Sequence, residues 1–333
     1  MLKIINGNAK QGVFMTNLKS KLMAVGALST LLTTGLIAGV PMNLAYPKGE
    51  LKDANTIMEN VYFVNHFYSF KNYSIEKKRR TITVLVKKSE GKKPLTDTVE
   101  RYLNNEYTDD PTIKAKDLAI FRSGKMKGTG MLITDYTDDK RSQEYLAWLP
   151  ALRKIRRFAQ PAHDDAWGGT DFSFGDVTLR KPMHETHELL GSETFGKRVH
   201  VLVIPKDQQT STTKKLPAGT DEYKNNKVYK VKSTTKFSGW WYDYRITYVD
   251  TKNFSDFRTE YYKKDKLVKI LEKNWKTIDG QTDPRALRWF TWYAKTMENG
   301  HETMAYIPKK VTKYNTPLKS SLWSKKTLTK IKK

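Results

Sequence analysis

Short segments in which apolar and polar residues alternate follow one another from Tyr73 almost to the end of the chain. A period of two is typical of strands with one buried face, and it is clearest at residues 82–86 and 242–248. Asn299-Gly300 between two such segments is a strong hairpin signal. With the segments at 118–122, 130–136, 143–149, 183–190, 198–204, 257–262, 266–275, 287–297 and 303–307, the pattern predicts roughly ten to twelve antiparallel strands in meander order.

Residues 50–67 have a different spacing. Apolar side chains such as Leu51, Ala54, Ile57 and Met58 recur at helical intervals, which predicts an amphipathic helix over one face of the sheet. The fold is therefore predicted to be mainly β, without the βαβ spacing of a parallel sheet. A sheet of that many strands must curl or split, and a curled sheet with a helix over its open face encloses an apolar hollow.

The N-terminal part predicts export. Lys19 and Lys21 precede nineteen uncharged residues, 22–40, and the small residue Ala45 follows Pro41. This order predicts a signal peptide over residues 1–45, cleaved after Ala45. An uncleaved membrane anchor is the alternative, because nineteen apolar residues nearly suffice to span a bilayer. We expect a domain at 46–312, a loosely held basic tail at 313–333, and a mobile loop at 206–226.

The composition indicates which kinds of partner the protein binds. The 333 residues carry a net charge of +25 and no cysteine, and removal of residues 1–45, with four lysines and no acid, leaves +21. An exported domain without disulfides must be held by its own core. Its charge favours acidic partners such as anionic headgroups or an acidic protein face, or else serves solubility alone. We expect no nucleic acid partner for a protein that leaves the cytoplasm, and we expect a monomer.

The densest group of special residues lies at 145–176. Residues 148–157 read Trp-Leu-Pro-Ala-Leu-Arg-Lys-Ile-Arg-Arg, and residues 168–176 read Gly-Gly-Thr-Asp-Phe-Ser-Phe-Gly-Asp. Together with Phe121-Arg-Ser, Lys127-Gly-Thr, Arg245-Ile-Thr-Tyr and Gly300-His-Glu-Thr, in this order, the chain resembles the outer-membrane lipoprotein-sorting family, in its LolA-like branch. The resemblance covers roughly residues 50–310, and Thr170, Phe174 and Gly175 depart from the usual pattern of the branch.

The resemblance implies an incomplete β-barrel with a short helical lid, located in the periplasm. It implies that lipid or the acyl chains of a lipoprotein bind in the hollow, and that the protein is accessory to a membrane transporter of the RND or MMPL type. Two other functions stay open. One is a non-carrying interaction module that docks through its basic face on a transporter or envelope surface, and the other is an envelope hydrolase.

Two of the motif's features allow both a functional and a structural interpretation. Arg156 and Arg157 could bind a phosphate or an acidic protein surface, but alternation places them on opposite faces of a strand. We favour an ion pair of one arginine with Asp171 or Asp176. Gly168 and Gly169 predict a strand-to-helix corner, which could also act as a hinge, with Asp171 as the cap of a helical turn. The residues expected to build the motif are Trp148, Pro150, Arg153, Arg156, Arg157, Gly168, Asp171, Phe172 and Asp176.

No motif indicates catalysis, a cofactor or a metal. His184 and His187 would lie on opposite faces of a strand, and His163 lies in a polar turn. Gly-x-Ser-x-Gly and His-Glu-x-x-His are both absent from the sequence, so we expect no enzyme. The aromatic stripe of the later strands is the candidate lining of the hollow: Tyr242, Tyr244, Ile246, Tyr248, Trp289 and Tyr293.

Overall fold

The computed structural model describes residues 39–331, so the predicted signal peptide lies mostly outside the described part. Its last residues contact the domain: Val40 is buried beside Tyr62, Phe63 and Tyr68, and the Leu44 carbonyl oxygen accepts a 2.8 Å hydrogen bond from Arg285. Cleavage after Ala45 would remove these contacts, and that boundary stays a prediction. Within residues 39–331, no helix is both long enough and apolar enough to cross a membrane.

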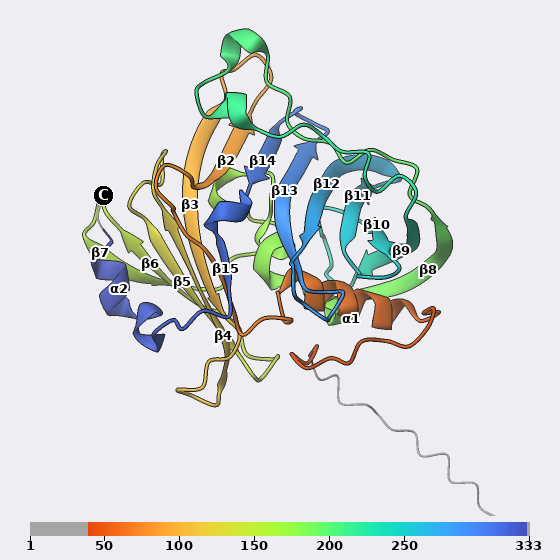
Figure 1. Ribbon diagram of the computed structural model, residues 1–333, viewed down its shortest axis with the longest axis horizontal. Helices are drawn as coiled ribbons and strands as arrows, with labels where there is room; N and C mark the ends of the chain where they lie inside the picture. The colour runs from red at the N-terminus through yellow and green to blue at the C-terminus, as the bar shows by residue number, and fades with distance from the viewer. Residues whose placement is uncertain (1–38, 332–333) are drawn as a thin grey trace, which may run out of the picture. The chain divides into compact units, whose positions relative to one another are not determined.

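One antiparallel sheet that does not close into a barrel contains all the strands of residues 39–331 (Figure 1). Its strands are β1 (Asn72–Ile75), β2 (Thr83–Lys88), β3 (Leu95–Asn104), β4 (Ile113–Phe121), β5 (Gly130–Tyr136), β6 (Glu144–Leu149), β7 (Lys154–Phe158), β8 (Glu185–Thr194), β9 (Lys227–Thr235), β10 (Tyr244–Asp250), β11 (Asp256–Lys263), β12 (Lys266–Thr277), β13 (Leu287–Thr296), β14 (Glu302–Tyr306) and β15 (Thr312–Tyr314). Their order is β7-β6-β5-β4-β3-β2-β14-β13-β12-β11-β10-β9-β8, with β1 between β15 and β3. The mainly β, incomplete-barrel prediction is confirmed, with 15 strands in place of ten to twelve.

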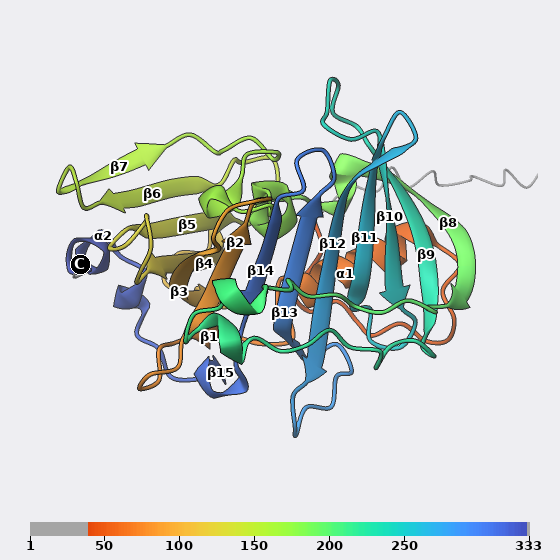
Figure 2. The same ribbon diagram turned by 90° about the horizontal axis from the view of Figure 1, so that it is seen from above.

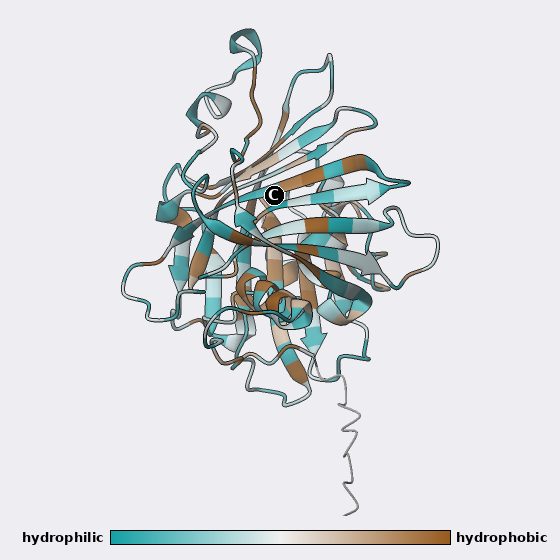
Figure 3. Ribbon diagram, turned by 90° about the vertical axis from the view of Figure 1, so that its right-hand side faces the viewer, coloured by the Kyte–Doolittle hydropathy of each residue, from teal (hydrophilic) through white to brown (hydrophobic). Residues whose placement is uncertain are grey.

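Helix α1 (Ala54–Asn65) confirms the helix predicted over residues 50–67. Asp53 caps it, because its carboxylate accepts hydrogen bonds from the backbone N–H groups of Asn55 and Thr56. In Figures 1 and 2 the helix lies in the bend of the sheet, on its concave side. The main core is there, and residues on many strands alternate between hydrophobic and hydrophilic in Figure 3.

The convex side is covered as well. Leu202 and Ile204 pack on Val84 and Met304 of the sheet, in the segment where the sequence predicted a strand at 198–204. The structure shows no named strand at 198–204, only an isolated bridge between Val199 and Thr220. The short helical turns outside the lid are η4 (Lys206–Gln208), η5 (Thr213–Lys215), η6 (Lys309–Val311) and η7 (Ser320–Leu322).

The C-terminal segment is not loose, contrary to the prediction. β15 pairs with β1. Trp323, just before α2 (Lys325–Thr329), and Leu328, within this helix, are buried against the outer face of β4 to β6. Trp323 Nε1 donates a 2.8 Å hydrogen bond to the carbonyl oxygen of Tyr102. Residues 206–226 are likewise tied at one end, since the Tyr223 hydroxyl donates to Asn274 Oδ1 at 2.7 Å.

Candidate functional site

The segment from Ala166 to Glu185, here called the lid segment, crosses the concave side of the sheet. It contains the turns η1 (Trp167–Gly169), η2 (Gly175–Leu179) and η3 (Pro182–His184). Gly168 and Gly169 have φ angles of 62° and 69°, which glycine adopts at little cost, and they lie in η1 at the position of the predicted corner. The prediction that Asp171 caps the helical turn is wrong: Ser173 N–H donates to Asp176 at 2.9 Å, and Asp176 N–H donates to Ser173 Oγ at 3.2 Å.

An apolar cavity lies between the lid segment and the sheet. Trp167, Phe172 and Val177 form the lid side, and Phe172 stacks on Trp292 of β13 with 4.5 Å between ring centroids. The cavity has a volume of about 50 Å³. Thr178 of the lid segment also lines it, and its remaining walls come from β1 to β5, β13, β14 and Ile307: Ile75, Thr83, Leu85, Val99, Arg101, Asp117, Ala119, Ile133, Trp289, Ala305 and Ile307.

Several polar groups interrupt this apolar wall. Arg101 donates from Nε and Nη2 to Asp117 at 2.7 to 3.1 Å, and its guanidinium lies 5.4 Å from the centre of the Trp289 ring. Trp289 Nε1, Trp292 Nε1 and Thr83 Oγ1 are buried without a hydrogen-bond partner. A buried donor without an acceptor costs about 1–3 kcal/mol, so three of them around one cavity are a notable departure from ordinary core packing.

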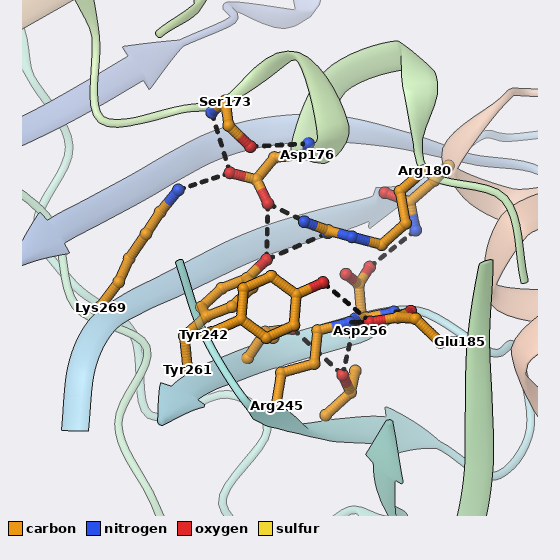
Figure 4. Close-up of polar contacts among 12 residues, drawn as sticks. Ser173, Asp176, Arg180, Glu185, Tyr242, Arg245, Asp256, Tyr261 and Lys269 are labelled. Atoms are coloured by element: carbon orange, nitrogen blue, oxygen red, sulfur yellow. Dashed lines mark hydrogen bonds and ion pairs between the residues drawn. The ribbon is translucent and has the colours of Figure 1, made fainter. Parts of the chain in front are cut away.

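A buried ion cluster joins the lid segment to β8, β10, β11 and β12 (Figure 4). Asp176 is its first centre: Lys269 Nζ and the Tyr261 hydroxyl each lie 2.5 Å from the carboxylate, and Arg180 Nη1 lies 3.1 Å away. Burial alone would raise the pKa of Asp176, but the charges of Lys269 and Arg180 outweigh burial and hold that pKa far below its usual range. Asp176 is therefore a carboxylate at every ordinary pH.

Glu185 is the second centre of the ion cluster. Arg245 grips it with two hydrogen bonds, of 2.9 and 2.6 Å, and the Tyr242 hydroxyl donates a third at 2.9 Å. Burial opposes ionisation here too, but the charge and hydrogen bonds of Arg245 lower the pKa of Glu185 to about 2. A similar pair, Lys273 with Asp256 at 2.7 Å, lies beside α1, where Lys273 also donates to Asn65.

Asp171 holds the other end of the lid segment. Its carboxylate accepts hydrogen bonds from Thr296 at 2.6 Å and Thr303 at 2.7 Å, and it lies 2.5 Å from His301 Nδ1. These partners lie on β13, on β14 and in the hairpin that contains Asn299-Gly300. The lid segment is thus fastened at Asp171, Asp176 and Glu185 by carboxylates that reach five strands or their connections.

The arginine pair of the motif lies elsewhere. Arg156 and Arg157 are exposed on β7, and the register of β7 with β6 confirms that they lie on opposite faces. Arg157 pairs with Glu144 of β6, so the favoured ion pair with Asp171 or Asp176 is wrong. Trp148 lies on β6, and Pro150 and Arg153 lie in the hairpin between β6 and β7. These three residues are far in sequence from the residues that contact the lid segment.

The structure places the residues predicted to line the hollow in different environments. Trp289 lines the cavity, whereas Tyr242 lies on the concave side but belongs to the ion cluster. The others require correction because β10 and β13 present them to the opposite face. Arg245 and Thr247, which alternate with them, are the side chains directed at the lid. Tyr244 stacks on Tyr262, Tyr248 packs on Phe195, Tyr293 packs with the convex-side cluster, and Ile246 lies between the two outward tyrosines.

The histidines form no metal site in the described part of the chain, where no group of three metal-binding side chains occurs. His163 and His184 lie with ring centroids 5.0 Å apart, beside Phe237 and Trp240. Burial lowers the pKa of each to about 4. Both rings are therefore neutral at ordinary pH, in an aromatic setting that suits packing.

Several solved structures have a fold similar to that of this chain. A DUF1329 family protein from Desulfovibrio piger matches with a TM-score of 0.59 at 17% identity, over 83% of this chain and 98% of that chain. A protein described as an outer membrane lipoprotein-sorting protein domain, from Vibrio parahaemolyticus, matches with a TM-score of 0.60 at 14% identity over the same shares. A LolA superfamily protein from Nitrosomonas europaea gives 0.50 at 11% identity, over 83% of this chain and all of that chain.

A family model described only as an uncharacterized protein matches residues 114–217, the region that contains the lid segment. No curated protein matches the chain. At these identities the likeness concerns the fold, and the fold is LolA-like. This confirms the resemblance that the motif residues indicated.

Sequence reasoning missed Arg101, Asp117, Arg180, Glu185 and Trp292. All five are buried or half-buried. Alternation does not show which face of a strand Arg101, Asp117, Glu185 or Trp292 occupies, and Arg180 lies in the lid segment, outside the strands. The one available signal was composition: β10 to β12 carry Arg245, Lys269 and Lys273 among apolar residues, where buried charges require partners.

Proposed function

We propose that the protein is a periplasmic carrier that binds lipid or lipoprotein acyl chains in the apolar cavity, as an accessory to a membrane transporter of the RND or MMPL type. The observation that carries the proposal is the cavity that Trp292 of the sheet and Phe172 of the lid segment both line, whose walls are mainly apolar. Each buried methylene contributes ~0.8 kcal/mol, so a chain of about a dozen gains a gross ~10 kcal/mol before ordering costs.

The cavity also favours one kind of ligand. Its three unpaired donors, on Thr83, Trp289 and Trp292, would be satisfied by ester, carboxylate or phosphate oxygens and not by a plain hydrocarbon. An amphiphile with oxygen atoms near its chain therefore fits these walls best.

Its volume requires movement of the lid. About 50 Å³ is well below the roughly 300–1,000 Å³ typical of ligand sites, so the ligand enters only when the lid segment moves away from β13. Partner and compartment rest on the sequence resemblance, on the predicted signal peptide and on the lipoprotein-sorting name of the Vibrio parahaemolyticus relative.

Ligand carriage can be tested on the purified protein by native mass spectrometry and by uptake of a fluorescent fatty acid. Ala119→Phe fills the cavity from β4 and should abolish uptake, whereas Ala218→Phe in an exposed loop should leave it unchanged. A protein that arrives empty and takes up no probe, or an Ala119→Phe protein that binds as well as the native one, would overturn the proposal.

The second candidate is the non-carrying interaction module. The nearly filled interior and the net charge of +25 favour it. If the protein is such a module, it should contain no hydrophobic ligand, and its binding to an acidic surface should depend strongly on salt. The uptake experiment separates the two candidates, because only a carrier responds to Ala119→Phe.

A further inference from the structure

Strand β7 (Lys154–Phe158) forms one edge of the sheet. It pairs with β6 alone, and in Figure 2 no strand lies beyond it. An edge strand presents backbone N–H and C=O groups on its outer side, and these can pair with a strand from another chain.

The side chains of this edge are exposed on both faces. Every residue of β7 except Ile155 is exposed. Two large apolar residues flank or end the strand, Leu152 with 51% and Phe158 with 46% of its surface exposed. Charged residues alone would protect this edge from pairing with another chain, so large exposed apolar side chains are unexpected here.

The edge is also strongly basic. Arg153, Lys154, Arg156 and Arg157 follow one another, and residues 145–163 contain no acid. Arg157 has a partner in Glu144 on the outer face, whereas Arg156 lies on the other face beside Phe158 in the alternation of the strand. An extended chain along β7 would therefore meet a guanidinium on each of its faces.

The opposite edge differs. β8 carries Glu185, Glu188 and Glu193 and has a register irregularity at Gly191, which interrupts regular pairing. Its end lies near the start of α1, where Ser192 contacts Glu50. The β7 edge is thus the regular and basic one of the two.

We propose that the β7 edge is a docking site for an extended acidic segment of a partner protein, which adds to the sheet as a further strand. Backbone pairing with β7 provides the register, carboxylates of the segment bind Arg156 and Arg157 on the two faces, and Leu152 and Phe158 contact its apolar residues. Short charged strands often serve only to protect an edge, but such an edge gains nothing from exposed leucine and phenylalanine. Carriage of a ligand is not required for this docking.

Fluorescence anisotropy tests the proposal on the full protein with a labelled synthetic peptide in which pairs of valines alternate with pairs of glutamates, so that carboxylates reach both faces of the added strand. We expect binding that weakens with salt, and Arg156→Glu should weaken it by about tenfold or more. Lys206→Glu, an equal charge change at an exposed residue of η4, is the matched control and should have little effect. The same peptide with methylated backbone nitrogens should lose binding, because it cannot complete the ladder.

Four outcomes would overturn the proposal. Equal binding of the methylated peptide would mean that charge alone attracts it. Equal weakening by Arg156→Glu and Lys206→Glu would mean that net charge, and not this edge, is responsible. Binding to anionic phospholipid vesicles but not to the peptide, or self-association abolished by Arg156→Glu, would assign the edge to a membrane or to a second copy of the chain.

Discussion

Asp171, Asp176 and Glu185 are each held by groups from strands far away in the sequence. The hydroxyl of Thr303 reaches Asp171, and Lys269 reaches Asp176, across separations of 132 and 93 residues. Buried charges of this kind contribute little net stability as a pair, but losing one partner leaves the other uncompensated. A mutation that removes one partner should therefore lower the free energy of unfolding by more than the intact pair contributes to it.

Asp176→Asn should lower the free energy of unfolding by about 3 kcal/mol or more, because Lys269 and Arg180 would keep their charges without a carboxylate. Urea denaturation followed by tryptophan fluorescence measures this. Asp207→Asn, at an exposed residue of η4, is the control and should stay within about 0.5 kcal/mol of the native protein. Similar losses for both variants would show that the ion cluster is not a special source of stability.

The histidines predict a dependence of stability on pH. Burial lowers the pKa of His66 to about 3, and that of His163 and His184 to about 4, from 6.5. The unfolded chain binds protons at these sites before the folded chain does, so their contribution is complete above pH 6.5 and is lost as the pH falls toward 4. We expect the free energy of unfolding from urea titrations to fall over this window, by up to about 1.4 kcal/mol per pH unit for His66, the most buried of the three. His163 and His184 should contribute less, because solvent screens them.

The control for this dependence is a histidine removed without loss of packing. His66 stacks on Tyr62 with 3.7 Å between ring centroids, so His66→Phe keeps the ring and removes the titration. Its midpoint should depend less steeply on pH. An unchanged slope between pH 6.5 and 4 would mean that His66 does not contribute to the pH dependence, since Glu185, with its pKa of about 2, acts only at lower pH.

At this scale the sequence allowed only part of the site to be predicted. The glycine corner at Gly168 and the importance of Asp171 and Asp176 followed from local chemistry. Their partners did not, because Arg156 and Arg157 were nearer in sequence than Lys269 or His301 and looked equally suitable. Only the tertiary fold selects among basic residues of equal charge.

The periodicity of the sequence predicted the positions of strands and helices far better than it predicted which face of each strand points toward the lid segment. β5 at residues 130–136 and β12 from residue 266 were predicted with bounds within a few residues of those found. The inward face of β10 was not, because both faces of this sheet are covered and alternation then marks two buried sides. Arg245 points toward the lid and Tyr248 toward the segment that contains Phe195.

The C-terminal element provides a prediction of its own. Trp323→Ala should cost about 3–5 kcal/mol of unfolding free energy, because the ring is 2% exposed between α2 and the outer face of β4 to β6. Thermal unfolding with Leu95→Ala as the control, at a residue 67% exposed, measures the difference. A loosely held tail would instead give the two variants the same small effect.

The whole molecule combines a continuous sheet with one segment that can close over its apolar part. The walls of the cavity come from β1 to β5, β13 and β14, while β10 to β12 provide the charges that fasten the lid segment. The charged contacts at Asp176 and Glu185 thus lie away from the cavity, whereas the contacts of Asp171 with Thr296 and Thr303 lie on β13 and β14, beside it. The proposed opening of the lid segment would leave the strand pairing of the sheet unchanged.

The chain contains no cysteine, so the opening of the lid can be tested by a single engineered disulfide. The backbone nitrogen of Asp171 lies 3.0 Å from Thr303 Oγ, which puts the two side chains close enough for Asp171→Cys and Thr303→Cys to be joined. If ligand enters by movement of the lid segment, the oxidised double variant should take up fluorescent fatty acid at least about tenfold more slowly than the reduced one. Each single variant should be insensitive to reductant, which separates the crosslink from the loss of the Asp171 contacts. Equal uptake in both redox states would place the entrance elsewhere, because a fastened lid segment leaves only about 50 Å³ beneath it.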